Sequence, residues 1–117
     1  MTHLHVPIVD FPTEDLRGHL DTLCDFIHDA LSEQQNKVLV HCLAGLSRSP
    51  AVVIAYLMKH HNMTFAEAHN FVFERRPMIS PNNGFVEQLK KYEADLSGRK
   101  HKKNYISGLI HSLRKKQ

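Results

Sequence analysis

The sequence is poor in the residues that mark several special classes of protein. It has 2 cysteines and no tryptophan in 117 residues, which excludes a disulfide-stapled scaffold and most structural zinc sites. No period recurs along the chain, so a collagen, a coiled coil and a repeat protein are also excluded. The longest apolar run, Ala51 to Met58, is far shorter than the roughly 20 residues of a membrane-spanning helix. The first residues lack the basic and then apolar pattern of a secretory signal.

What remains is the composition of one globular domain. Hydrophobic residues make up 42% of the chain and charged residues 23%, a balance that can bury a core and is unlike that of a disordered chain. With so few cysteines, the simplest expectation is a reducing, intracellular compartment, cytoplasmic or nuclear.

Positive charge is concentrated at the C-terminal end. The net charge is +3, yet residues 97–117 hold seven Lys and Arg and no acid, so residues 1–96 carry −4. A globally basic nucleic-acid binder would spread its charge over the whole body, so no nucleic-acid partner is expected for the domain. The 10 histidines show no ligand spacing such as His-Glu-x-x-His, and we predict no metal.

The hydrophobic pattern predicts an α/β fold. Residues 3–9 and 37–41 are predicted strands, and between them Thr13 is expected to cap a helix with Glu14 and Asp15 in its first turn. This order of strand, helix, strand and helix implies that the two strands are parallel in a small central sheet with helices packed around it. The predicted inward face of the first helix comprises Leu16, Leu20, Leu23, Cys24, Ile27 and Leu31.

Further helices are predicted downstream of the second strand. One runs over about 49–59 with Pro50 in its first turn, and one begins at the capping box Thr64-x-x-Glu67 and stops at 75–77. A turn at 80–84 leads into another helix, which we expect Ser97-Gly98 to end. The predicted buried residues of these last two helices are Phe65, Ala68, Phe71, Val72, Phe85, Leu89 and Tyr92. After the basic linker, a last amphipathic helix is predicted from Tyr105, Ile106, Leu109, Ile110 and Leu113.

The loop between the second strand and the next helix carries the chemistry. In Cys42-x5-Arg48 the backbone N–H groups from Leu43 to Arg48 can all turn inward and form an anion site at a helix N-terminus. Gly45 allows the close backbone approach, and the guanidinium of Arg48 matches two phosphate oxygens. Such surroundings are expected to lower the pKa of the Cys42 thiol, which makes it a thiolate nucleophile at neutral pH.

This segment and four others resemble one protein family. Val38-Leu-Val-His-Cys-Leu-Ala-Gly-Leu-Ser-Arg-Ser49 is similar to the signature of dual-specificity phosphatases, in the protein tyrosine phosphatase superfamily, and most like the MAP-kinase-phosphatase members. The other matching segments are Ala55-Tyr-Leu-Met58, Arg75-Arg-Pro77, Ile79-Ser-Pro-Asn82 and Gly84-Phe85. The resemblance covers about residues 3–96, which predicts a catalytic domain over 1–96 and a basic tail over 97–117.

The resemblance implies a role for each matching residue. Cys42 would be the nucleophile that becomes phosphocysteine, and Arg48 would hold the phosphoryl oxygens. Ser49 would help to break down the intermediate by hydrogen bonding to the leaving sulfur. His41 would orient the loop and tune the thiolate. No cofactor is implied.

Residues outside the loop complete the implied site. Asp10 would be the general acid, although a loop aspartate before Phe-Pro can also be a simple turn former. Asn82 would buttress the catalytic loop. The implied substrate-binding residues are Leu43, Ala44, Gly45, Leu46, Ser47 and Arg48.

The implied activity is hydrolysis of phosphotyrosine and of phosphoserine or phosphothreonine in proteins, with a MAP kinase as one substrate. The loop has no lysines of the kind that lipid phosphatases use there. Members of the family have further elements before the position of Met1, so we expect an N-terminally truncated, marginally stable domain. A phosphate-binding module with little turnover is therefore the alternative function. Sulfur transfer or arsenate reduction by a loop of the same shape is a weaker one.

Two features stay open at this stage. Cys24 is expected to be a core residue, while a disulfide with Cys42 has no support. The basic tail is a solvated extension, an amphipathic helix that contacts an anionic membrane or a partner, or a nuclear-import or nucleic-acid patch in Arg99–Lys103.

Overall fold

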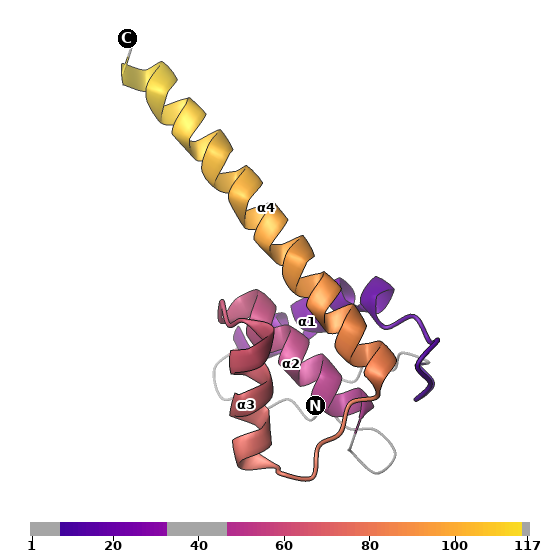
Figure 1. The fold of residues 1–117 in the computed structure, drawn as a ribbon. Coiled ribbons are helices and arrows are strands. Elements are labelled where there is room, and N and C mark those ends of the chain that lie inside the picture. Colours follow the sequence, from indigo (N-terminus) through magenta and orange to yellow (C-terminus); the bar gives the residue numbers. More distant parts are fainter. Residues whose placement is uncertain (1–7, 33–46, 116–117) are drawn as a thin grey trace.

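The computed structural model of the chain describes residues 8–32 and 47–115, with side chains as far as Lys100. These residues form the helices α1 (Arg17–Ser32), α2 (Arg48–His60), α3 (Phe65–Arg75) and α4 (Asn83–Lys115) (Figure 1). No strand occurs within these ranges. The predicted strand 37–41 lies outside the described residues, as does most of 3–9, of which Ile8 and Val9 adopt no regular structure. The predicted sheet is therefore not part of what the structure describes.

Helix α2 lies at the centre of the bundle and contacts each of the other three helices. It begins one residue earlier than predicted, and the missing N–H of Pro50 causes no loss because the first-turn donors of a helix have no partner within it. Small and branched side chains let the neighbours approach closely, and the helix is buried on most sides. Its buried residues are Ser49, Pro50, Ala51, Val52, Ile54, Ala55, Leu57 and Met58.

Helix α1 begins at Arg17, not near Thr13, so the prediction of its start was wrong. A side chain from α4 provides the reason: Oε1 of Gln88 accepts the N–H groups of both Leu16 and Arg17, each at 2.8 Å. This distant amide satisfies two of the donors at the start of the helix, and the local Asp15 satisfies a third, since its Oδ1 accepts the N–H of Gly18 at 3.0 Å. The inward face is as predicted for Leu16, Leu20, Cys24 and Ile27, whereas Leu31 is exposed.

Helix α3 begins with the predicted capping box. Oγ1 of Thr64 accepts the N–H of Glu67 at 3.1 Å, and the Glu67 carboxylate accepts the N–H of Thr64 at 3.0 Å. The helix ends at Arg75, before Pro77, as predicted. Phe71 is not buried as expected: it lies on the surface, where the Arg75 guanidinium packs over its ring with the carbon 3.5 Å from the ring centre.

Helix α4 is a single helix of 33 residues, so the prediction that Ser97-Gly98 ends it was wrong. An isolated glycine inside a helix costs about 1 kcal/mol, which is too little to stop a helix that has no proline after it. The C-terminal part of α4 extends well beyond the bundle (Figure 1), and the longest dimension of the molecule is 59 Å. None of the described helices combines the length and the apolar character needed to span a bilayer.

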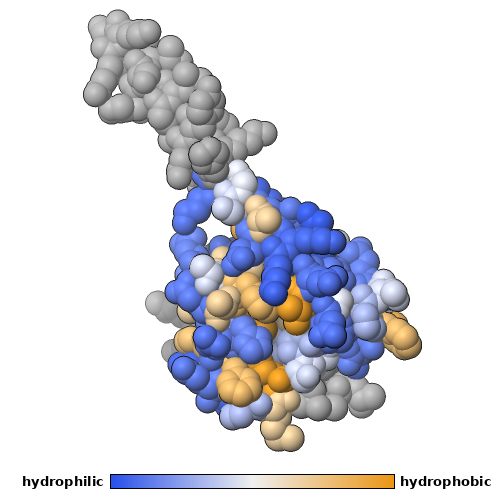
Figure 2. All heavy atoms as spheres, in the orientation of Figure 1, coloured by the Kyte–Doolittle hydropathy of each residue, from blue (hydrophilic) through white to orange (hydrophobic). Residues whose placement is uncertain are grey.

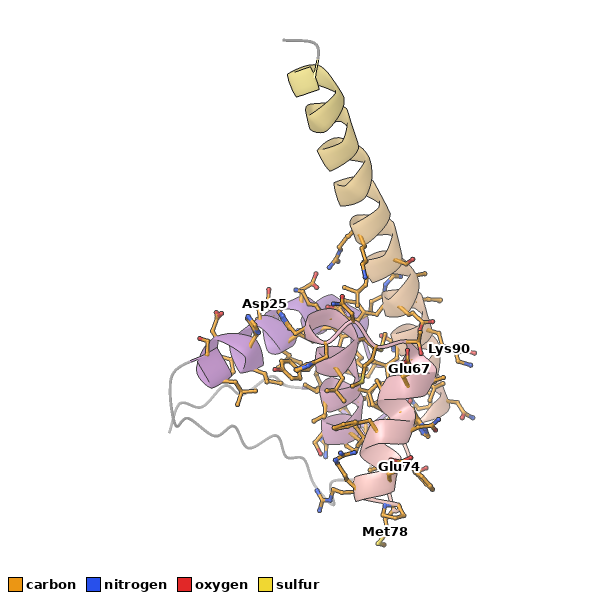
Figure 3. The ribbon with its side chains drawn as sticks, turned by 90° about the vertical axis from the view of Figure 1, so that its left-hand side faces the viewer. Asp25, Glu67, Glu74, Met78 and Lys90 are labelled. Carbon is orange, nitrogen blue, oxygen red and sulfur yellow. The ribbon has the colours of Figure 1, made fainter. Side chains whose placement is uncertain are left out.

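The face shown in Figure 2 is largely hydrophilic, with hydrophobic side chains in its centre and lower part. The exposed large hydrophobic residues are Val9, Phe11, Leu31, Phe71, Phe73 and Met78. Met78 is 78% exposed and lies at the end of the molecule opposite to the extension of α4 (Figure 3). It lies in the loop between α3 and α4.

A carboxylate on α1 joins three helices through polar contacts. Asp21 accepts the hydroxyl of the buried Tyr92 at 2.7 Å, both terminal nitrogens of Arg99 at 2.9 Å, and Nζ of Lys59 at 3.2 Å. The hydrogen bond from Arg99, followed by those from Tyr92 and Lys59, holds the pKa of Asp21 well below its usual 3.8. Its ionised form is therefore stabilised by folding.

We expect Asp21→Asn to lower the free energy of unfolding at neutral pH by about 1 kcal/mol, since these bonds are charge-assisted but half-exposed. Because folding lowers the pKa of Asp21, the contribution is complete above the unfolded carboxyl's pKa of 3.8 and is lost as the pH falls below it. Urea unfolding at several pH values should show a constant difference above about pH 5 that shrinks below about pH 4. Asp29→Asn, on the same helix, is the control that should change little.

Candidate active site

Three segments that are far apart in the sequence meet at one end of the bundle. They are the loop before α1, the start of α2 and the start of α4 (Figure 1). Of the predicted site residues, the structure describes Asp10, Ser47, Arg48, Ser49 and Asn82. The others lie outside the described residues: His41, Cys42, Leu43, Ala44, Gly45 and Leu46.

Ser47 anchors the described end of the predicted phosphate loop. Its side chain is buried, and its hydroxyl accepts the backbone N–H of Asn82 at 2.9 Å. Its carbonyl accepts the N–H of Ala51 at 3.1 Å and so opens α2. The loop end is thereby tied both to the helix that it enters and to the segment before α4.

Arg48 is the first residue of α2, and its guanidinium is only partly satisfied. One terminal nitrogen donates to the carbonyl of Ile8 at 3.1 Å. Nε is buried and has no hydrogen-bond partner within the part of the chain that the structure describes. A buried donor without an acceptor is costly, and a cationic one most of all. An oxyanion beside this group would supply the acceptor and the opposite charge.

Asp10 lies in an exposed turn, and a side chain from another segment holds it. Nδ2 of Asn82 donates to Oδ1 of Asp10 at 2.8 Å. Backbone bonds shape the turn itself, in which the N–H of Phe11 donates to the carbonyl of Val9 and the N–H of Glu14 to that of Phe11. The structure thus brings together Asp10, Asn82 and Ser47, as expected for a shared site.

Two residues that the sequence reasoning did not single out help to build this end of the bundle. Gly84 lies against the backbone of Pro12: a Cβ on Gly84 would come within 2.5 Å of the Pro12 Cα. Gln88 donates to the carbonyl of Glu14 at 2.8 Å and also caps α1. Gly84 belongs to a segment that resembles the family, which was a usable signal, but the sequence around Gln88 does not distinguish it from a surface glutamine.

Cys24, the cysteine that the structure describes, is not part of this site. Cys24 is a buried free thiol on α1. Burial raises its pKa to about 12, although the nearby Tyr92 hydroxyl favours the thiolate and opposes part of the shift. Cys24 is therefore the packing residue that was predicted.

Comparison with known proteins agrees with these observations. The family model described as "Dual specificity phosphatase, catalytic domain" matches residues 1–95. Dual specificity protein phosphatase 14 of Mus musculus is 47% identical over 97 residues, which are 83% of this chain and 48% of that protein. The chain thus spans about half the length of this relative.

Solved structures are also similar. The crystal structure of human DUSP28 superposes with a TM-score of 0.75 at 42% identity, and covers 78% of this chain and 61% of that one. The human tyrosine phosphatase-like serine/threonine/tyrosine-interacting protein gives a TM-score of 0.71 at 46% identity, with coverage of 74% and 57%. These neighbours have the α/β phosphatase fold, which supports the predicted class although the described residues hold only its helices.

The raised pKa of Cys24 predicts slow reaction with thiol reagents. In a Cys42→Ser variant Cys24 is the one cysteine left in the chain, and it should react with a disulfide reagent at neutral pH at least ~100-fold more slowly than a free cysteine. Unfolding in urea should restore the ordinary rate. A rapid reaction in the native protein would contradict the buried, protonated state of this thiol.

Proposed function

Since the chain belongs to the dual specificity phosphatase family, we propose that it hydrolyses phosphate monoesters of proteins through a phosphocysteine intermediate. The observation that carries the proposal is the position of Arg48. Its cationic side chain lies at the first turn of α2 with a buried donor that lacks an acceptor among the described residues. The predicted nucleophile lies at the other end of the same short loop, six residues earlier.

The reaction has two steps. The phosphoryl group binds as a dianion to the loop N–H groups and to Arg48, and the Cys42 thiolate attacks phosphorus opposite the leaving oxygen. The S–P bond forms as the P–O bond breaks, and Asp10 gives its proton to the leaving oxygen. Water then attacks phosphorus and gives a proton to Asp10. The P–S bond breaks with a hydrogen bond from Ser49 to the sulfur, inorganic phosphate leaves, and the thiolate is restored.

Two features of the described residues support the assignment of Asp10 as the acid. It is exposed, as a group that meets a protein substrate must be, and Asn82 connects it to the loop that ends at Ser47. A carboxyl group fixed relative to the phosphate site can transfer a proton without a long search for the correct geometry.

A second candidate function is capture of a phosphorylated protein with little turnover. One solved neighbour is named as a phosphatase-like interacting protein, at 46% identity. The presence of Cys42, Arg48 and Asp10 in the sequence favours catalysis over this alternative. A MAP kinase as substrate, a membrane or partner contact of the basic tail, and a cytoplasmic or nuclear location remain predictions.

Hydrolysis of an aryl phosphate tests the proposal. Cys42→Ser should abolish turnover because no thiolate remains to attack phosphorus, and Asp10→Ala should lower kcat by roughly 10²–10⁴-fold for a poor leaving group. The measurement is steady-state release of the phenol, with Asp29→Asn as a surface control that keeps full activity. Tight phosphopeptide binding with no turnover by the wild type would instead support the binding module.

A further inference from the structure

We propose that Asn82 is a positioning residue for the general acid: its side-chain amide holds one oxygen of Asp10, so that the other oxygen is the one that delivers the proton. The inference rests on the proposed function, because it gives Asn82 a task in that reaction beyond support of the catalytic loop. The carrying observation is the 2.8 Å hydrogen bond from Nδ2 of Asn82 to Oδ1 of Asp10.

The neighbours of the Asn82 amide determine its orientation. Its Oδ1 accepts the backbone N–H of Phe85 at 2.8 Å, a group that can only donate. Its Nδ2 meets the carboxylate oxygen of Asp10, a group that accepts when ionised. Both contacts require the same orientation, and the reverse one would break both. The amide is therefore fixed on one side by α4 and presents its donor to the acid.

The geometry of this bond suits a residue that must both give and take a proton. Oδ1 can accept the amide N–H whether the carboxyl group of Asp10 is protonated or ionised, because the proton can reside on Oδ2. The bond therefore survives both halves of the reaction. Without it, an exposed aspartate in a turn would sample several rotamers, and few of them would direct the proton toward the substrate.

A second contact, independent of the amide, holds the same turn. The backbone of Pro12 lies directly on Gly84, so closely that a Cβ there would meet the Pro12 carbonyl oxygen and lie 2.5 Å from its Cα. Gly84 thus permits the turn that holds Asp10 and Pro12 to approach the first turn of α4. A larger residue at position 84 must displace the backbone of Pro12, which lies two residues after Asp10. Backbone atoms cannot move aside as easily as the end of a flexible side chain.

Asn82→Asp separates positioning from capping. An aspartate at this position still accepts the N–H of Phe85, and a negative charge suits the start of α4. It cannot donate to Asp10, and it places a second carboxylate beside the first. The backbone N–H to Ser47 is unchanged. The variant should therefore fold with a melting temperature near that of the wild type, but its Asp10 carboxyl group should no longer be held in one orientation.

The test compares two leaving groups. For phenyl phosphate, whose leaving oxygen needs a proton, Asn82→Asp should lower kcat/KM about 10–100-fold. For 2,4-dinitrophenyl phosphate, whose leaving group departs without one, the change should stay within about threefold. In an Asp10→Ala background, Asn82→Asp should cause no further loss with phenyl phosphate, because residues that act as one unit are not additive.

A glycine pair provides the matched second test. Gly84→Ala should show the same selective loss for phenyl phosphate, since it displaces Pro12. Gly98→Ala lies in the same helix with nothing within 4 Å of the added Cβ, so it should leave activity toward both substrates unchanged. This pair keeps the inference testable even where Asn82→Asp fails to fold.

Equal losses for both substrates, or a loss that persists in the Asp10→Ala background, would overturn the inference, because Asn82 would then act on the loop and not on the acid. Full activity of Asn82→Asp toward phenyl phosphate would also overturn it. A failure of the proposed function looks different: Cys42→Ser would keep turnover, or Asp10→Ala alone would leave phenyl phosphate hydrolysis unchanged.

Discussion

The hydrogen bonds of Asn82 join three segments that the chain order separates widely. Its backbone N–H donates to Ser47 at the end of the predicted phosphate loop, its side-chain N–H donates to Asp10, and its side-chain oxygen accepts the N–H of Phe85 in the first turn of α4. A buried or half-buried amide with all these partners has one orientation only. The position of the turn that holds Asp10, relative to the loop that ends at Ser47, therefore depends on the start of α4.

Helix α4 also contacts α1 and the segment before it along several of its turns. Residues of α4 spaced three or four positions apart contact the segment from Pro12 to Asp21. Gly84 lies against Pro12, Gln88 bonds to the backbone between Glu14 and Arg17, and Tyr92 and Arg99 bond to Asp21. Asp95 adds a two-pronged pair with Arg17 at 2.7 and 2.5 Å. Residues at this spacing lie on one face of a helix, so one continuous face of α4 supports α1 and the turn before it.

Local patterns predicted the elements whose causes are local. The capping box of α3 needs only Thr64 and Glu67, which are three positions apart, and it is present as predicted. The start of α2 and the buried faces around Leu20 and Phe85 also follow from spacing and proline position. The start of α1 does not, because the distant Gln88 shares its capping with the local Asp15. The end of α4 was also mispredicted, because one glycine at position 98 costs a helix too little free energy to stop it.

The sequence was sufficient to identify the family and the candidate catalytic residues, which are a Cys-x5-Arg loop before a helix and an aspartate after a short apolar segment. Those features are readable because they depend on residue type at fixed short spacing. The hydrogen bond from Asn82 to Asp10 and the close approach of Pro12 to Gly84 are known from the folded structure alone. These contacts join residues about seventy positions apart, and their geometry depends on how four helices pack, which no local pattern encodes.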